Sequence, residues 1–423
     1  MAKTLVISID ALITADIDRL RKLPNFSRIM QDASIVRNIE CIYPTLTYPC
    51  HTTIATGCYP DRTGIVHNER LQPNAVKAEW NWWAKDIKVP TVIDVAREAG
   101  KTTSTITWPV MCGMDATYNI GEIWAPTDKD DPTPYFAQAD SPKAHDIFEK
   151  NKHMLNWMRT PPMDEFAAQC ACDILAIEQP DLMLLHLSYV DHQRHSKGVH
   201  GDLDDAFAFV DSQVGRVLDA LDKRGAFEDT VFVLLGDHGQ LVLEKMFHIN
   251  TVLRNRGLID EENGFITDWR AYAHSCSLSA QVYVAPGVDE AKVYQELLDI
   301  QQAYPGMIDA VFTRQEAKQL HHVEGDFAFM IEAGDKVCFG KAADAEQYIT
   351  EINDLKEYKP SVSNHGHLPS KGDKPPFIIK GPGIRKDVDI PAGRLIDEAP
   401  TILRTLQLDM PSADGQCIEQ LFE

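Results

Sequence analysis

Long apolar runs are absent from this sequence. No stretch approaches the roughly 18 consecutive apolar residues that a membrane-spanning helix needs, so we expect no membrane association. The opening residues, MAKTLVISID, also lack the longer apolar core and the small-residue cleavage site of a secretory signal peptide. These two absences favour a cytoplasmic protein.

Paired cysteines and an excess of basic residues are missing as well. The nine cysteines are scattered without any Cys-x-x-Cys pair, which predicts free thiols rather than a disulfide framework or a cysteine-based zinc site. The formal net charge is −22, so we do not expect the basic face that binds a nucleic-acid polymer. A small anionic substrate is still allowed, because divalent cations in a cleft reverse the local field.

What the chain does contain is an alternation of short apolar runs with longer amphipathic stretches. Runs with the length and composition of buried strands lie at residues 4–9, 182–187, 230–235 and 376–380. Apolar residues recur at helical spacing over residues 141–158, 163–178 and 202–224. Near-continuous apolar strands that alternate with helices predict an α/β fold, with a mostly parallel sheet covered by helices on both faces.

Residues 259–361 follow a different pattern. Strand-like segments and one helical stretch occur there, at residues 278–284, 327–332, 336–339 and 290–304. We interpret this region as an α+β cap inserted into a larger α/β domain made of residues 1–258 and 362–423. A chain of 423 residues exceeds the usual size of a single core, which agrees with a main domain that carries an insertion.

Side chains that can bind metals follow several of the expected strands. They are Asp10, Asp191, His195, Asp237, His238 and His365, the last of which lies in a polar loop before the fourth strand. Because ligands collect at the carboxyl ends of strands in open α/β sheets, these residues can converge on one edge. Carboxylate and imidazole groups suit zinc or a similar divalent metal, and this set is large enough for two ions.

Each of these residues also has an ordinary structural explanation. An aspartate after a strand, such as Asp10, commonly caps the next helix. Asp191 and His195 are spaced to pair on one helix face, and the Asp-His-Gly sequence after the third strand is typical of a turn. His186 lies inside an apolar run and is expected to be a core histidine, whereas the role of His51 stays open.

The segment at residues 43–64 reads YPTLTYPCHTTIATGCYPDRTG and contains two candidate hydroxyl groups. Thr45 and Thr47 precede a helical run, and a hydroxyl at a helix N-terminus lies where backbone N–H groups favour an oxyanion. The same position is the usual one for a threonine that caps a helix. The residues by themselves therefore leave a nucleophile and a cap as alternatives.

This segment resembles the nucleophile region of the nucleotide pyrophosphatase/phosphodiesterase family, which belongs to the alkaline phosphatase superfamily. The resemblance rests on Pro-Thr-Leu-Thr-Tyr-Pro and on the residues that follow it, His51, Thr56-Gly57, Tyr59-Pro60, Gly64-Ile65 and Asn68. It extends over almost the whole chain, because the metal-binding residues also occur in the family's order. It implies an alkaline phosphatase-like fold, with residues 1–258 and 362–423 as the catalytic domain.

The resemblance also implies a role for each matching residue. Thr47 is the nucleophile, and Asn68 donates a hydrogen bond to a non-bridging phosphate oxygen. One zinc ion is expected on Asp10, Thr47, Asp237 and His238, and a second on Asp191, His195 and His365, with manganese as the alternative metal. We expect Tyr48, which replaces the family's base-stacking phenylalanine, and Trp108, in a Trp-Pro pair like the family's, to contact the substrate.

Several other residues depart from the family's pattern. Cys50 replaces an asparagine, Thr63 replaces a histidine and Val110 replaces a glycine, and no match is apparent for the family's second base-stacking aromatic residue. These changes spare the metal-binding residues but weaken the expectation of a nucleotide substrate. The Cys/Ser-x-Pro-x-Arg motif of the related sulfatases is absent.

The resemblance implies a metal-dependent hydrolase that cleaves phosphodiester or pyrophosphate bonds through a phosphothreonine on Thr47. The neutral amide of Asn68 suits a singly charged diester better than a monoester dianion, although Arg62 and Arg70 lie nearby in the sequence. The alternatives are a carbon–phosphorus hydrolase resembling phosphonoacetate hydrolase, a phosphomonoesterase and, from another class, an inactive metal-binding regulatory protein. The expected partner is a small-molecule phosphate ester or phosphonate, and the sequence leaves the oligomeric state unknown.

Overall fold

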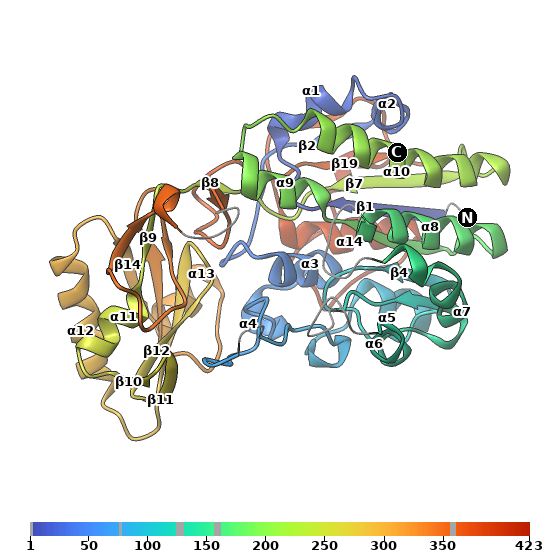
Figure 1. The fold of residues 1–423 in the computed structure, drawn as a ribbon. Helices are drawn as coiled ribbons and strands as arrows, with labels where there is room; N and C mark the ends of the chain where they lie inside the picture. The colour runs from blue at the N-terminus through green and yellow to red at the C-terminus, as the bar shows by residue number, and fades with distance from the viewer. Residues whose placement is uncertain (1–2, 76–77, 124–130, 156–161, 356–360) are drawn as a thin grey trace.

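The larger part of the molecule is built around a mixed β-sheet (Figure 1). The computed structural model describes residues 3–75, 78–123, 131–155, 162–355 and 361–423. Among these residues the sheet has eight strands, in the spatial order β20 (Asp389–Ile390), β2 (Ser34–Val36), β19 (Phe377–Lys380), β7 (Thr230–Leu235), β1 (Lys3–Ile9), β6 (Leu182–Leu187), β4 (Thr103–Ile106) and β5 (Tyr118–Ile120).

The central strands of this sheet run parallel. β1 pairs in parallel with β6 and with β7, and β4 pairs in parallel with β6 and with β5. β19 is antiparallel to both of its neighbours, β7 and β2. The predicted α/β class with a mostly parallel sheet is confirmed, and the strand expected at residues 376–380 joins that sheet in the opposite direction.

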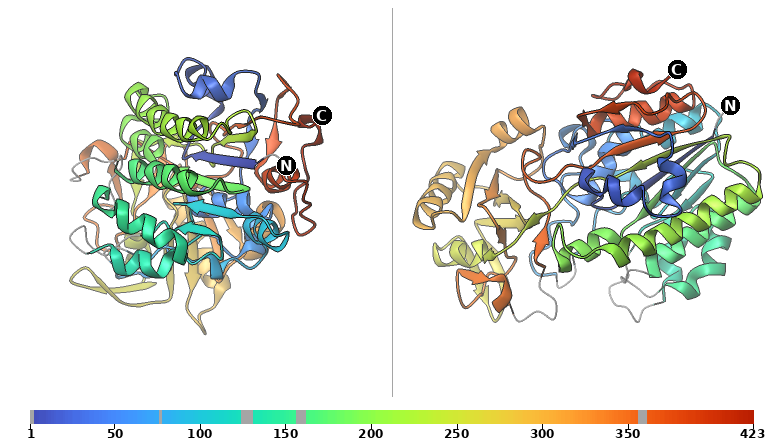
Figure 2. Two further views of the ribbon diagram at one scale, coloured as in Figure 1. Left: turned by 90° about the vertical axis from the view of Figure 1, so that its right-hand side faces the viewer. Right: turned by 90° about the horizontal axis from the view of Figure 1, so that it is seen from above.

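Helices cover both faces of the sheet (Figure 2). One face packs against α7 (Pro142–Asn151), α8 (Pro162–Ile177) and α10 (Asp204–Lys223), and the other packs against α3 (Thr47–Thr56), α5 (Val92–Glu98) and α14 (Glu398–Thr405). Along β1 the side chains of Ile7 and Ile9 enter the first core and Val6 enters the second. Each such burial contributes about 1.5–3 kcal/mol, which is why this strand is apolar on both faces.

Shorter elements connect these layers. The helices are α1 (Ile17–Leu20), α2 (Phe26–Met30), α4 (Pro60–Thr63), α6 (Thr133–Ala139) and α9 (Tyr189–Lys197). Two small two-stranded pairs join β3 (Ile39–Glu40) to β21 (Gly393–Arg394) and β8 (Leu241–Val242) to β18 (Ser363–Asn364). No helix among the described residues has the length and hydrophobicity needed to cross a membrane.

A second group of elements lies to one side of the main sheet (Figure 1). Its antiparallel sheet has the order β12 (Ala271–Ser275), β13 (Ser279–Val284), β15 (Phe329–Ala333) and β14 (Ile308–Thr313). Smaller sheets are formed by β9 (Lys245–Phe247), β16 (Val337–Phe339) and β17 (Ile349–Glu351), and by the hairpin of β10 (Ile259–Glu262) and β11 (Phe265–Trp269). The helices here are α11 (Ile249–Asn255), α12 (Glu290–Ala303) and α13 (Arg314–His321).

This group has a hydrophobic core of its own, which includes Val282, Leu297 and Ile331. Phe247 and Leu253 belong to the same core, although they precede residue 259, at which we expected the insertion to begin. The strands and the helix expected between residues 278 and 339 are present within one or two residues of their predicted limits. We therefore propose that the inserted cap begins at β9. Its expected end, residue 361, directly follows residues 356–360, which lie outside the described part of the chain.

Candidate active site

The carboxyl ends of three central strands bring distant residues together at one edge of the main sheet. Ile9 of β1 lies opposite Leu187 of β6, and Ser8 lies opposite Leu235 of β7. The segments that follow these strands therefore emerge side by side, as ligand-binding segments do in open α/β sheets. All six predicted acidic and histidine ligands lie on this edge or on the loop after β18.

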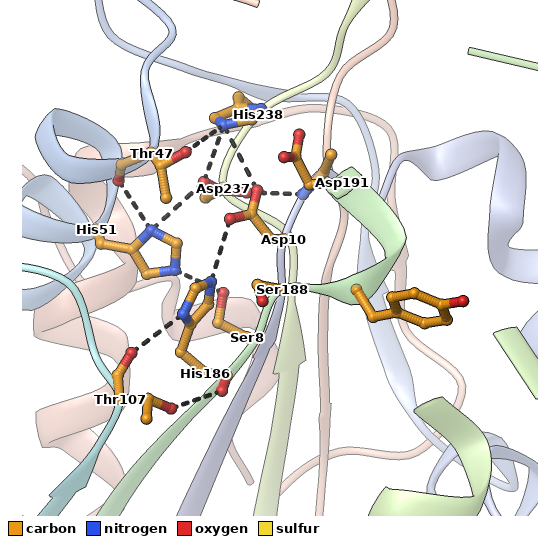
Figure 3. Close-up of polar contacts among 12 residues, drawn as sticks. Ser8, Asp10, Thr47, His51, Thr107, His186, Ser188, Asp191, Asp237 and His238 are labelled. Carbon is orange, nitrogen blue, oxygen red and sulfur yellow. Dashed lines mark hydrogen bonds and ion pairs between the residues drawn. The ribbon is translucent and has the colours of Figure 1, made fainter. Parts of the chain in front are cut away.

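Four of the predicted residues meet around one imidazole nitrogen (Figure 3). His238 Nε2 lies 3.1 Å from Thr47 Oγ1, 3.2 Å from Asp237 Oδ2 and 3.6 Å from Asp10 Oδ1. Asp10 follows β1 directly, Asp237 and His238 come just after β7, and Thr47 is the first residue of α3. We call these four residues the first group.

The first group fits a divalent metal ion. Ligand atoms about 2.0 Å from a tetrahedral zinc ion are about 3.3 Å apart from one another, close to the spacing observed here. Asp10 Oδ1 and Asp237 Oδ2 are buried, and neither accepts a hydrogen bond from the described residues. A buried carboxylate oxygen without a partner is costly, and a cation between the two oxygens would satisfy both.

The electrostatics of the first group point the same way. Burial, followed by the charges of Asp237 and Asp191, raises the pKa of Asp10 well above its usual value. Burial also raises the pKa of Asp237 to about 8. Two adjacent buried carboxyl groups resist ionisation together, and a bound cation would reverse that tendency.

The remaining predicted ligands form a second group beside the first. Asp191 and His195 lie on α9, where Asp191 Oδ2 is 3.1 Å from His195 Nε2, and His365 Nε2 is 3.9 Å from Asp191 Oδ1. The most compact set of ligand atoms here joins Asp191 and His365 to His238, whereas His195 adjoins that set through Asp191. His238 therefore lies between the two groups, and its ring stacks on that of His365 with the centroids 4.0 Å apart.

Backbone carbonyls fix the tautomers of two histidines in the second group. His195 Nδ1 is 2.9 Å from the carbonyl oxygen of Ser363, and His365 Nδ1 is 3.1 Å from that of Thr45. A carbonyl only accepts, so each Nδ1 carries the proton and each Nε2 keeps its lone pair for a metal. Burial opposes the charge of Asp191, but His195, His365 and His238 together hold its pKa well below the usual value.

The structure separates the two candidate threonines. The Thr45 hydroxyl donates to the carbonyl of His367 and accepts from the backbone N–H groups of Gly366 and His367, so it supports a loop. Thr47 instead places its hydroxyl in the first group, at the N-terminus of α3. Asn68 Oδ1 accepts from the Tyr48 N–H at 2.9 Å, which leaves the Asn68 amide nitrogen as the donor available to a ligand.

A cleft of about 1190 Å³ opens above these residues. Asn68 and His365 line it from the main part of the molecule, and Ser275, Phe339 and Lys341 line it from the inserted region. Lys341 Nζ forms an ion pair with Glu69, at 2.6 Å from Oε2, and thereby joins the two walls. The inserted region therefore forms one wall of the cleft.

The two predicted substrate-contacting aromatic residues do not line this cleft. Tyr48 and Trp108 are both fully buried, and Trp108 Nε1 is turned inward toward the carbonyl of His51. Trp80 lines the cleft instead, with its ring centroid 5.1 Å from that of Tyr48. Trp80 was not predicted as a site residue, although it belongs to the aromatic run WNWW at residues 80–83, which is a signal that could have marked it.

Two histidines outside the predicted ligand set support the first group from below (Figure 3). His51 Nδ1 donates to the carbonyl of Thr47 at 2.8 Å, and His51 Nε2 accepts from the Ser8 hydroxyl at 2.9 Å. His186 is a satisfied core histidine, as predicted, and its Nδ1 lies 3.1 Å from the carbonyl of Thr107. Its Nε2 also lies 3.2 Å from Asp10 Oδ2, a contact that the sequence pattern did not reveal.

A buried ion pair anchors α9, the helix that carries two of the ligands. Arg194 and Asp16 are almost completely buried and bond to each other, and Asp16 also bonds to Arg19. Replacing Arg194 with methionine leaves the Asp16 carboxylate without its main counterion, which should lower the free energy of unfolding by roughly 3–5 kcal/mol. Urea unfolding measures this loss.

Arg21→Met is the matched control, because Arg21 pairs with Asp18 on the surface. Exposed pairs of this kind contribute at most about 1 kcal/mol, so the control should unfold close to the unaltered protein. Equal unfolding midpoints for the two variants would contradict a structural role of the buried pair.

The chain is similar in sequence to proteins of one known family. The chain matches the family described as type I phosphodiesterase / nucleotide pyrophosphatase over residues 4–351. It is 24% identical over 241 residues to human ectonucleotide pyrophosphatase/phosphodiesterase family member 1, an alignment that covers 55% of this chain and 23% of that protein. An uncharacterized pyrophosphatase/phosphodiesterase of Schizosaccharomyces pombe is 26% identical over 230 residues, which cover 50% of this chain and 41% of that one. The chain thus spans less than half the length of these relatives.

The fold also matches solved structures. Murine ectonucleotide pyrophosphatase/phosphodiesterase 5 superimposes with a TM-score of 0.69 and 18% sequence identity, and the match covers 100% of both chains. An inactive threonine-to-alanine variant of that murine protein, in complex with AMP, gives the same TM-score at 17% identity. At this identity the likeness shows the fold, and it agrees with the α/β sheet and helical layers described above.

Proposed function

Because the chain belongs to the type I phosphodiesterase / nucleotide pyrophosphatase family, we propose that it is a metal-dependent hydrolase of phosphodiester or pyrophosphate bonds. The observation that carries this proposal is the position of the Thr47 hydroxyl, 3.1 Å from His238 Nε2 and at the N-terminus of α3. Its substrate is a small phosphate ester that enters the cleft between the main sheet and the inserted region.

Two zinc ions, or manganese as the alternative, fit the residues present. The first group, Asp10, Thr47, Asp237 and His238, would hold one ion, and Asp191, His195 and His365 would hold the other. When bound, such ions supply Lewis acidity that lowers the pKa of a hydroxyl and neutralises charge on the phosphoryl group.

The chain's own residues account for the rest of the reaction. The Thr47 oxygen attacks phosphorus in line with the leaving oxygen, so that a phosphothreonine forms as the alcohol departs. Water then attacks the same phosphorus and releases a phosphate monoester and free Thr47. The Asn68 amide and the Thr47 N–H, which has no partner within its own helix, donate to the non-bridging oxygens as negative charge develops.

The pairing of the two arginines near Asn68 in the sequence favours a diester over a monoester. A monoester dianion carries about two negative charges, which an arginine beside the reacting group would balance better than a neutral amide. Arg62 pairs with Asp414 at 2.5 Å and Arg70 pairs with Asp86 at 2.6 Å. Neither arginine is among the residues that line the cleft, so Asn68 has no cationic substitute there from this segment.

A comparison of three substrates tests the proposed function. The metal-loaded protein should turn over bis(4-nitrophenyl) phosphate with a kcat/KM at least about tenfold above that for 4-nitrophenyl phosphate or phosphonoacetate, a difference of about 1.4 kcal/mol. Release of nitrophenolate or acetate would be measured on one preparation. If the diester is the poorest substrate, the diesterase assignment is wrong, and if none is hydrolysed by fully loaded protein, the chain is an inactive metal-binding protein.

A further inference from the structure

Gln240 is a buried residue whose side-chain amide contacts Asp191 of the second group. It lies in the same segment of the chain as Asp237 and His238 of the first group. It follows Asp237 and His238 by one glycine, and only 1% of its surface is exposed. Its Nε2 donates to Asp191 Oδ1 at 2.5 Å and lies 3.4 Å from the carbonyl oxygen of Asp191. Its Oε1 is 2.7 Å from the hydroxyl of Ser363, whose single proton has two acceptors within reach, this oxygen and the carbonyl oxygen of Arg194 at 2.6 Å. Both ends of this side chain are therefore engaged inside the molecule.

These contacts close a ring of four residues around the second group. The carbonyl of Ser363 accepts from His195 Nδ1 at 2.9 Å, and His195 Nε2 lies 3.1 Å from Asp191 Oδ2. The ring thus runs from Asp191 through Gln240, Ser363 and His195 back to Asp191. Its members come from three separate segments, which are α9, the turn before β8, and β18.

The backbone around Gln240 is held as firmly as its side chain. Ser363 and Asn364 of β18 pair with Val242 and Leu241 of β8, directly after Gln240. On the other side, a Cβ atom at Gly239 would lie 2.1 Å from the carbonyl oxygen of Asp373, so only glycine allows this close approach. The position of the amide is therefore set from both directions along the chain.

The chemistry of the two contacts requires an amide of this length. Asp191 presents a carboxylate, which only accepts, and Ser363 presents a hydroxyl that can donate. A glutamate would turn a second carboxylate toward Asp191, and leucine would remove both hydrogen bonds. Outer hydrogen-bond partners of this kind orient metal ligands and commonly change metal affinity by about 10–100-fold when they are lost.

We propose that Gln240 is a positioning residue that fixes the carboxylate of Asp191 and thereby assembles the second metal-binding group. This role of Gln240 rests on the proposed function, because it presumes that Asp191, His195 and His365 bind a metal. Gln240 also ties this group to the first one, since only Gly239 separates it from His238. Its loss should weaken the second ion and leave the first ion in place.

Metal binding to the full chain tests this proposal independently of turnover. Zinc content after dialysis and competition with a chromogenic chelator would be measured for the unaltered protein and for Gln240→Leu. We expect two ions in the unaltered protein, and in Gln240→Leu one ion with unchanged affinity and one weakened by about 10–100-fold. Gln213→Leu is the control, because Gln213 is buried on α10 and bonds to Arg216 away from the site.

Ser363→Ala supplies a second test that a general loss of packing would not reproduce. It removes the hydroxyl that holds Gln240 Oε1, and should weaken the same ion to a smaller extent. If both residues act through one ring, the double variant should bind no more weakly than Gln240→Leu alone, because the effects of residues in one network are not additive. Ser363→Ala also serves if Gln240→Leu does not fold.

The possible failures are distinguishable. An unaltered protein that binds fewer than two zinc ions would contradict the proposed function itself. An unaltered protein that binds two ions, together with Gln240→Leu that binds both as tightly as the Gln213→Leu control, would overturn the role of Gln240 alone. Fully additive losses in the double variant would show that the two residues act separately and would overturn the ring.

Discussion

Replacing Thr47 with alanine should abolish turnover while leaving the fold and the metal content intact. The hydroxyl is the only part of Thr47 that lies in the first group, and no other described hydroxyl shares its contact with His238 Nε2. Without that oxygen no covalent intermediate forms, and kcat should fall by at least about 10,000-fold. Asp10, Asp237 and His238 still provide three ligands, which suffice to retain an ion.

Thr52→Ala is the matched control for this change. Thr52 is buried on the same helix, and its hydroxyl donates to the carbonyl of Tyr48 at 2.8 Å rather than to the site. We expect the control to keep turnover within a few-fold of the unaltered protein. If Thr47→Ala stays within about tenfold of that control in kcat, the nucleophile has been assigned to the wrong residue.

Removing the metal should be the second large effect. In the metal-free protein the first group contains two buried carboxyl groups, and one oxygen of each, Asp10 Oδ1 and Asp237 Oδ2, has no hydrogen-bond partner among the described residues. Nothing then lowers the pKa of the Thr47 hydroxyl or balances the charge of the phosphoryl group, so turnover should fall by at least about 1,000-fold, equivalent to several kcal/mol. Dialysis against a chelator, with zinc measured before and after, provides the test.

Adding metal ions back to the stripped protein is the control for this second prediction. Zinc should return the activity, manganese should be the other candidate to do so, and magnesium should not, because imidazole ligands suit the first two metals better. Binding to the folded state alone also stabilises it, by about 2.7 kcal/mol when free zinc is 100 times its dissociation constant. A protein stripped of zinc that keeps its turnover and its melting temperature would contradict a metal-dependent site.

The fold illustrates which structural features a single sequence reveals. β6 and β7 have the limits that their apolar runs predicted, because strands buried on both faces tolerate few polar residues. β2, β4 and β20 were missed, since they span only two to four residues, and β4 consists largely of serine and threonine. The direction of β19 depends on where the chain returns to the sheet, which no local pattern records.

For the site, too, the sequence predicted some residues and not others. The predicted ligands converge because each follows a strand or a loop at one edge, and strand ends can be read from the sequence. The burial of Tyr48 could not be predicted from the sequence, because it arises from distant segments that cover the first turn of α3 on every side. Trp80 and Gln240 reach the site through loops whose course depends on contacts between distant segments, so their roles emerged only in three dimensions.

The most direct test of the account is to identify the residue that becomes covalently modified during turnover. The metal-loaded protein would be mixed with bis(4-nitrophenyl) phosphate, quenched in acid within the first turnover, digested and analysed by mass spectrometry. We predict a 4-nitrophenyl phosphoryl group on Thr47, together with one equivalent of released nitrophenolate for each modified chain. An adduct on another residue, or nitrophenolate release without any modified Thr47, would contradict the central claim that Thr47 is the nucleophile.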